Sequence, residues 1–115
     1  MKNYLFFLEY VAASIDNIEA FVKDVNKQSF LTNVEKQSAI IRQIEIIGES
    51  VKNIPKEFRD KHPLIEWDKI AGMRDKIIHN YFGVDLDLVW KVVKNDIPNL
   101  KIQISEILKK DKKAK

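Results

Sequence analysis

An apolar seam with alternating spacings of four and three residues opens the sequence and limits the folds available to it. The seam consists of Tyr4, Leu8, Val11, Ile15, Ile18, Val22 and Val25. This spacing matches one face of an α-helix, which completes a turn every 3.6 residues. Phe7 and Phe21 widen the stripe beyond the narrow seam of a coiled coil, which favours packing in a bundle. The pattern predicts a first helix over about residues 2–27.

The same spacing returns in two later segments. One comprises Ile40, Ile44, Ile47, Val51 and Ile54, and the other Leu86, Val89, Val93, Ile97, Leu100, Ile104 and Ile107. Thr32 and Glu35 form a capping-box pattern, so the second helix is expected to begin near residue 33. Asp85 is suited to cap the last segment, and Pro98 is expected to kink it or divide it into two helices.

Between these segments the sequence predicts a connector and a third main helix. "IPKEFRDKHP" begins and ends near a proline, which indicates a short helix or a turn-rich connector, with His62 as a solvated loop residue. The third helix is expected to run from about Trp67 to Phe82 and to end at Gly83. Ala71 and Gly72 would allow a neighbouring helix to approach closely.

The composition bounds the class of protein. The chain has 115 residues and only three Gly and three Pro, which favours one all-α domain, an up-and-down bundle of four to five helices over residues 1–108. The tail "KKDKKAK" has a net charge of +4, and the whole chain +3, so +3 less +4 leaves −1 for the domain. Residues 109–115 are expected to be disordered, and the basic balance belongs to them.

Several classes of function are disfavoured. The chain has no Cys and two His, so a disulfide framework is excluded and a metal centre is not expected, nor is any cofactor. Glu9, Asp16 and Glu19 interrupt the apolar N-terminal region before it could form a signal peptide or a membrane span. We therefore expect a cytoplasmic protein without membrane contact.

The stretch "RDKIIHNY" contains the residues of this chain that are best suited to catalysis. His79 near a helix end has a structural interpretation, since a helix dipole favours its charged form. It also has a catalytic one, because metal-free RNA cleavage needs a group that moves protons near neutral pH and a fixed cation for the phosphorane charge. Arg74 would supply that cation. Residues five apart on a straight helix lie about 140° from each other, so either the helix loosens or two chains pool their residues.

This stretch resembles the R-x4-H-x-Y motif of the HEPN superfamily, and the surrounding sequence is similar to its HepT branch of toxin–antitoxin ribonucleases. "AIIRQIEIIGESVKNIP", "IEWDKIAGMRDKIIHNYFGVDLDLVW" and "DIPNLKIQI" carry the resemblance, which covers roughly residues 3–108. It implies an all-α bundle that pairs as a two-fold dimer, with both motifs in a cleft at the interface. Arg74 would then clamp phosphate and His79 act as general acid or base on tRNA or mRNA, without a metal ion.

The resemblance also implies a partner. Tyr81 matches a regulatory tyrosine that an MntA-like minimal nucleotidyltransferase antitoxin modifies with AMP, as in a type VII-like system. The alternative is a tyrosine packed with its hydroxyl at the rim of the fold.

Four further residues are candidates for the lining of the cleft. Asn80 would bind phosphate or cap the helix. Arg42, Glu45 and Glu49 lie on one face of the second helix, either as a solvated face or as lining of the cleft that orients Arg74.

Two other functions remain open at this point. A non-catalytic dimer could use the same cleft to hold a nucleotide or to dock a nucleotidyltransferase, and the charge of −1 slightly favours it, because RNA binding normally leaves a basic footprint. A purely structural helical bundle would explain the seams but not the motif.

Overall fold

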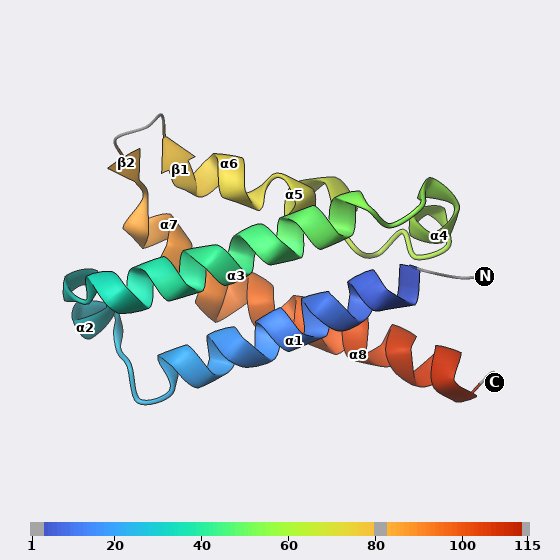
Figure 1. Cartoon of the computed structure of the whole chain (residues 1–115), viewed down its shortest axis with the longest axis horizontal. Coiled ribbons are helices and arrows are strands. Elements are labelled where there is room, and N and C mark those ends of the chain that lie inside the picture. The colour runs from blue at the N-terminus through green and yellow to red at the C-terminus, as the bar shows by residue number, and fades with distance from the viewer. Residues whose placement is uncertain (1–3, 80–82, 114–115) are drawn as a thin grey trace.

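Three long helices form the frame of the molecule: α1 (Tyr4–Val22), α3 (Val34–Lys52) and α8 (Ile97–Lys113). The computed structural model describes residues 4–79 and 83–113, except for the side chains of residues 79 and 111–113. In Figure 1 the chain runs alternately along the long axis, through α1, then α3, then a segment of short helices, then α8. The predicted all-α, up-and-down bundle is confirmed for the described residues.

Shorter elements connect and complete this frame. They are α2 (Lys27–Thr32), α4 (Lys56–Asp60), α5 (Trp67–Ala71), α6 (Met73–Ile77), β1 (Ile78–His79), β2 (Gly83–Val84), α7 (Leu86–Lys91) and the π-helix η1 (Val92–Asp96). The described part therefore contains more and shorter helices than the four to five predicted, and the added breaks fall mainly in its second half.

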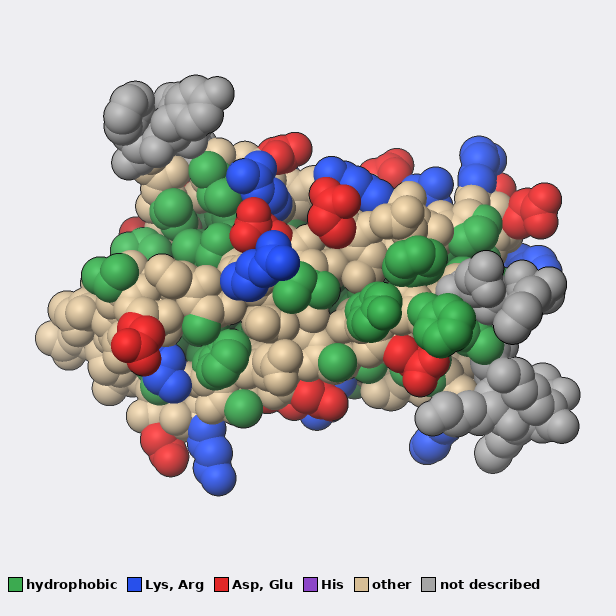
Figure 2. All heavy atoms as spheres, viewed as in Figure 1, with side chains coloured by type: hydrophobic (Ala, Val, Ile, Leu, Met, Phe, Trp, Pro, Cys, Tyr) green, Lys and Arg blue, Asp and Glu red, His purple; other side chains and the backbone are tan. Residues whose placement is uncertain are grey.

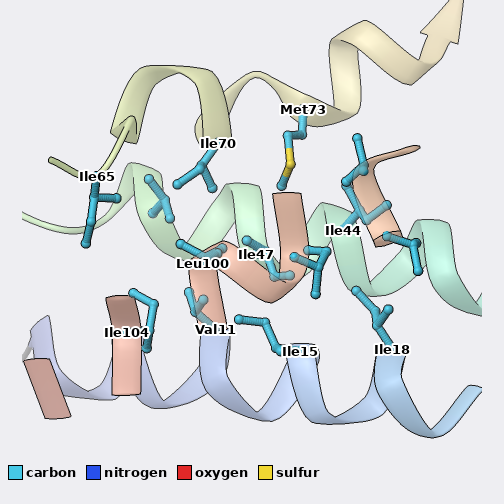
Figure 3. Packing of buried hydrophobic residues seen from close by; sticks show 14 of the residues in the cluster. Val11, Ile15, Ile18, Ile44, Ile47, Ile65, Ile70, Met73, Leu100 and Ile104 are labelled. Carbon is cyan, nitrogen blue, oxygen red and sulfur yellow. The ribbon is translucent and has the colours of Figure 1, made fainter. Parts of the chain in front are cut away.

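The predicted apolar seams form the core. Leu8, Val11, Ile15 and Ile18 of α1 face Ile40, Ile44, Ile47 and Val51 of α3, and α8 covers them with Ile97, Leu100, Ile104 and Ile107. Figure 3 shows these side chains converging from α1, α3 and α8, with Ile70 and Met73 entering from α5 and α6. Each buried Ile or Leu contributes roughly 1.5–3 kcal/mol of transfer free energy.

The first predicted helix ends earlier than expected. α1 stops at Val22, and Asp24 adopts a left-handed backbone conformation with φ 62°. Asn26 then starts α2 with a capping box, in which its side chain accepts a hydrogen bond from the Ser29 backbone N–H. A polar residue that satisfies free N–H groups is enough to begin a new helix here.

The second predicted helix begins where expected but with a different cap. Asn33, not Thr32, is the N-cap of α3, and its side chain accepts a bond from the Lys36 N–H at 3.0 Å. The Thr32 hydroxyl instead donates to the Ser29 carbonyl of the preceding helix at 3.2 Å. Asn is at least as strong a cap as Thr, so the one-residue shift has a simple cause.

The predicted helix over residues 67–82 is wrong as a single element. It breaks at Gly72 and ends at Ile77, after which Ile78 is extended and β1 pairs antiparallel with β2. Ile78 is β-branched and fits extended backbone, and Gly83 pairs with His79 instead of ending a helix. The close approach predicted at Ala71 and Gly72 comes from Gly48 of α3, where an added Cβ would lie 3.3 Å from the Ala71 carbonyl oxygen.

The last segment keeps its predicted start and its irregularity at proline. The Asp85 side chain accepts a bond from the Leu88 N–H at 3.0 Å and caps α7. Because Pro98 has no N–H to continue the α pattern, the turn before it widens into η1, where the Ile97 N–H bonds to the Val92 carbonyl. α8 then continues to Lys113 and so includes residues 109–113 of the lysine-rich tail.

Candidate functional site

The predicted site residues with described side chains lie where α3 meets α6. Arg74 is on α6, between Met73 and Ile77, which both point into the core. Glu45 is on α3, between the buried Ile44 and Ile47. Since both residues are flanked by core positions, the packing of the two helices fixes the separation of their backbones.

Arg74 and Glu45 form an ion pair at the rim of this contact. The Arg74 Nε donates a hydrogen bond to the Glu45 carboxylate at 2.8 Å. The Arg74 side chain keeps 51% of its surface exposed, whereas the Glu45 side chain keeps 28%. A second carboxylate, that of Asp75, lies 3.6 Å from the Arg74 Nη1. The guanidinium is therefore held on one side and open to solvent on another.

These carboxylates secure the charge of Arg74. The hydrogen bond to Glu45 has the largest effect and raises the pKa of Arg74 above its ordinary value. Desolvation comes next and lowers the pKa, while the negative charges of Glu45, Asp75 and Glu49 raise it. An arginine is already protonated throughout the physiological range. Arg74 is therefore a permanent cation in this setting.

The other two α3 candidates are placed differently. Arg42 and Glu49 are both exposed, one turn to either side of Glu45. Glu49 forms an ion pair with Lys52 at 3.6 Å and influences Arg74 only through its charge. Figure 2 shows Lys or Arg and Asp or Glu side chains intermingled where α3 meets the α5–α6 segment. Of the three, Glu45 is the one whose side chain hydrogen-bonds to Arg74 within the described part of the chain.

The remaining motif residues are described only in part. His79 lies in β1 with its backbone paired to Gly83, and its side chain is outside the described residues. Asn80 and Tyr81 also lie outside them. Because α6 ends at Ile77, the separation of about 140° on a straight helix does not apply to Arg74 and His79. The sequence left two ways to bring Arg74 and His79 to one phosphate, a loosened helix or two chains that pool their residues. In the structure the helix ends before His79.

His62 has a structural environment. Its ring lies 4.6 Å from that of Phe58, and its carbonyl accepts a bond from the Trp67 indole N–H at 3.0 Å. The residue therefore fixes the connector between α4 and α5. Among the described residues, no group of three or more His, Asp or Glu side chains is arranged to hold a metal ion. None of the described helices is long and apolar enough to cross a membrane.

A lysine-lined cavity near the motif was not anticipated. It has a volume of about 210 Å³, a floor that includes Met73 and Val92, and a rim with Lys69, Lys76 and Lys91. Lys76 is two positions from Arg74, about 200° around the helix, so this cavity opens on the other edge of α6. Lys69 and Lys91 are far apart in the sequence, and only the packing of α5 and α6 against α7 and η1 brings them together.

The chain is similar to several proteins that are named as probable or putative ribonucleases. The model of a family described as ribonuclease HepT-like matches residues 11–107. A "probable ribonuclease HepT" of Thermococcus cleftensis is 48% identical over 103 residues, which cover 90% of this chain and 94% of that protein. A "putative RNase" of Caldanaerobacter subterraneus subsp. tengcongensis is 43% identical over 112 residues, 97% of this chain and all of that protein.

A longer relative also matches. The "gamma-glutamylcyclotransferase and putative RNase" of Methanocaldococcus jannaschii is 47% identical over 114 residues, which cover 99% of this chain. The match spans 51% of that protein, so this chain corresponds to about half of it. No solved structure matches the chain.

Proposed function

Because the chain belongs to the ribonuclease HepT-like family, we propose that it is an endoribonuclease that cleaves tRNA or mRNA without a metal ion, with Arg74 and His79 as its catalytic pair. The ion pair between Arg74 and Glu45 is the structural observation that supports this most directly. It holds a permanent cation at the protein surface, five residues before a histidine. A cation and a proton-transfer group are what metal-free phosphodiester cleavage requires.

The reaction is an internal transfer at phosphorus. The 2′-hydroxyl oxygen of RNA forms a bond to the adjacent phosphorus, and its proton passes to a base. The bond from phosphorus to the 5′-oxygen breaks, and that oxygen receives a proton. His79, with a reference pKa near 6.5, would take part in these proton transfers, and Arg74 would bind the non-bridging oxygens as their charge grows. The products are a 2′,3′-cyclic phosphate and a 5′-hydroxyl end.

A pair of histidine variants tests the catalytic assignment. In the presence of EDTA, wild-type protein should cut a labelled RNA and His79→Ala should lose at least about 10²-fold in rate, the usual contribution of a general acid or base. His62→Ala is the matched control, since it removes the other histidine, which stacks on Phe58. If His79→Ala cuts as fast as His62→Ala and both keep the helical circular dichroism of wild type, His79 is not catalytic.

We further propose that the chain works as a two-fold dimer with composite sites, each combining residues of both subunits. An exposed hydrophobic surface supports this. Hydrophobic side chains gather toward the α4 end of the face that Figure 2 shows. Phe6 and Tyr10 on α1 are more than half exposed, at 57% and 55%. Exposed aromatic side chains close together are typical of a surface that binds protein.

Mixed subunits test the composite site. Arg74→Ala and His79→Ala chains are co-produced in equal amounts, so that about half of the dimers contain one of each. If each site draws its arginine and histidine from different subunits, every mixed dimer has one intact site, and activity returns to about a quarter of wild type. No recovery in a mixture that light scattering shows to be dimeric would contradict the proposal.

Regulation by a partner completes the proposal. A separate MntA-like nucleotidyltransferase would transfer AMP to the Tyr81 hydroxyl, so that the chain is the toxin of a toxin–antitoxin pair. A phosphate two residues beyond His79 would compete with the RNA backbone for Arg74. Mass spectrometry of the chain co-produced with its genomic neighbour should detect added AMP on wild type and none on Tyr81→Phe. Unmodified Tyr81 in inactive, co-produced protein would count against this mode of control.

A second function is favoured by the charge of the domain. Residues 1–108 have a net charge of −1, which is unusual for a protein that binds RNA, so the cleft could serve only to hold a nucleotide or a nucleotidyltransferase. In that case binding of the nucleotide or the partner depends on Arg74. Protein purified free of the antitoxin does not cut RNA.

A further inference from the structure

Glu45 and Arg74 are joined by two rigid elements. Ile44 and Ile47 anchor α3 on either side of Glu45, and Met73 and Ile77 anchor α6 on either side of Arg74. Figure 3 shows Ile44, Ile47 and Met73 converging on the same part of the core. Gly48 lets α3 approach α5, the segment just before α6, at the neighbouring turn, so the carboxylate has a fixed position relative to the arginine.

The hydrogen bond engages a particular part of the guanidinium. Glu45 binds Nε, and the terminal nitrogens Nη1 and Nη2 are not donors in this bond. The terminal edge is one of the two that fork onto two phosphate oxygens, and half of the Arg74 side-chain surface is exposed. A partner at Nε restricts rotation of the side chain, and among the described residues the terminal edge carries only the longer ion pair with Asp75, 3.6 Å from Nη1.

We infer that Glu45 is a positioning residue that holds Arg74, through Nε, in the orientation that binds the RNA phosphate. This inference rests on the proposed function and adds a residue to its site. Glu45 itself does not contact the reacting atoms. Its contribution is to reduce the number of arginine rotamers that must be lost when RNA binds.

The negative charge of Glu45 and its orienting hydrogen bond predict changes of opposite sign in RNA affinity when Glu45 is replaced. A carboxylate beside a phosphate site repels RNA, so its removal should strengthen binding if its charge is all that matters. Removal should weaken binding if the carboxylate orients the arginine. Glu45→Gln separates the two, because the amide oxygen can still accept the Nε hydrogen bond but carries no charge.

The test measures binding of an RNA oligonucleotide with 2′-O-methyl groups, which cannot be cleaved, by fluorescence anisotropy. Glu45→Gln should bind as well as wild type or up to about tenfold more tightly. Glu45→Ala should bind at least about tenfold more weakly, close to Arg74→Ala, although it has lost a negative charge. The same order should hold for the cleavage rate of unmodified RNA.

Glu19 provides the matched control. Its carboxylate accepts a 2.7 Å hydrogen bond from Lys101, between side chains that are 44% and 45% exposed, on α1 and α8. Glu19→Ala and Glu19→Gln therefore remove a similar ion pair from another part of the surface. Both should bind RNA as wild type does. Circular dichroism of all variants establishes that each is folded.

Two results would overturn the inference. One is a Glu45→Ala protein that is folded and binds the oligonucleotide as tightly as wild type or more tightly. The other is an Arg74 Nε–H signal in the nitrogen–proton spectrum that exchanges with water as fast as that of exposed Arg42. Neither result depends on turnover. Wild-type protein that binds RNA but does not cut it would refute the ribonuclease proposal and leave the role of Glu45 in binding intact.

Discussion

Gly48 is the residue whose replacement tests the link between the core and the site. It lies in the middle of α3, and an added Cβ would lie 3.3 Å from the Ala71 carbonyl oxygen and 3.7 Å from that of Ile70. Both neighbours are backbone atoms of α5, which cannot rotate away as a side chain can. Gly72 offers a contrast, because its added Cβ would be 3.4 Å from the Asp68 carbonyl oxygen, an ordinary contact.

Two effects of Gly48→Ala oppose each other. Alanine is favoured over glycine in a helix interior by about 1 kcal/mol. Crowding a well-packed contact costs about 1–3 kcal/mol, and the α5 backbone is held in place by the buried Trp67 and Ile70. We therefore expect a net loss of about 1 kcal/mol in the free energy of unfolding. Gly72 has a φ of −93°, which alanine can adopt, so Gly72→Ala should raise the free energy of unfolding by about 0.4–1 kcal/mol.

Urea unfolding followed by far-ultraviolet circular dichroism measures both variants. The expected order of stability is Gly72→Ala above wild type and Gly48→Ala below it, with equal denaturant slopes. A Gly48→Ala protein more stable than wild type would show that helix propensity outweighs the contact with α5, and the reasoning about a fixed α3–α5 distance would fail. Displacement of α5 should also move α6, so RNA binding through Arg74 should fall in the same variant.

Three further changes address the frame of the fold. Ile47→Ala should lower the free energy of unfolding by about 2–5 kcal/mol, because Ile47 is completely buried between helices, and guanidinium unfolding measures the loss. Asn33→Ala removes the cap of α3 and should cost about 1 kcal/mol, seen as a lower melting temperature; an unchanged value would exclude the cap as a stabilising element. Trp67→Phe removes the N–H that bonds the Arg59 and His62 carbonyls at 3.2 and 3.0 Å, and should cost about 1–3 kcal/mol while amide exchange in α4 becomes faster.

The long helices were predictable because the pattern that stabilises them is local and periodic. The seam of Leu8, Val11 and Ile15 repeats with the helix, and its buried partners in α3 and α8 repeat in the same way. Periodicity and capping residues therefore predict these helices without knowledge of the tertiary structure. They also identify Asp85 as a cap, because a capping residue acts within its own turn.

The segment after Trp67 was not predictable in the same way. Its apolar residues fit a helical period as far as Ile77, but the backbone then turns into a hairpin whose other strand is Gly83 and Val84. Local preference for helix and strand is nearly balanced at Ile77 and Ile78, so tertiary packing decides between them. The same limit applies to Arg42, Glu45 and Glu49, since the period placed them on one face but could not show which one meets α6.

The end of α6 at Ile77 bears on the case for a dimer. On a straight helix Arg74 and His79 would point in different directions, and pairing of two chains would bring them together. The early end of the helix removes this argument for a dimer.

The charges around Arg74 give a separate argument for a dimer. The Arg74 guanidinium lies beside two carboxylates, those of Glu45 and Asp75, whose combined charge exceeds its own, while the nearby Glu49 is paired with Lys52. A strand of RNA phosphates would be repelled by such a surface unless a second cation entered the same cleft. A second subunit, brought by a two-fold axis, is the simplest source of a further cation, and the mixed-subunit experiment, which shows whether both subunits contribute to one site, therefore decides more about the mechanism than any single variant.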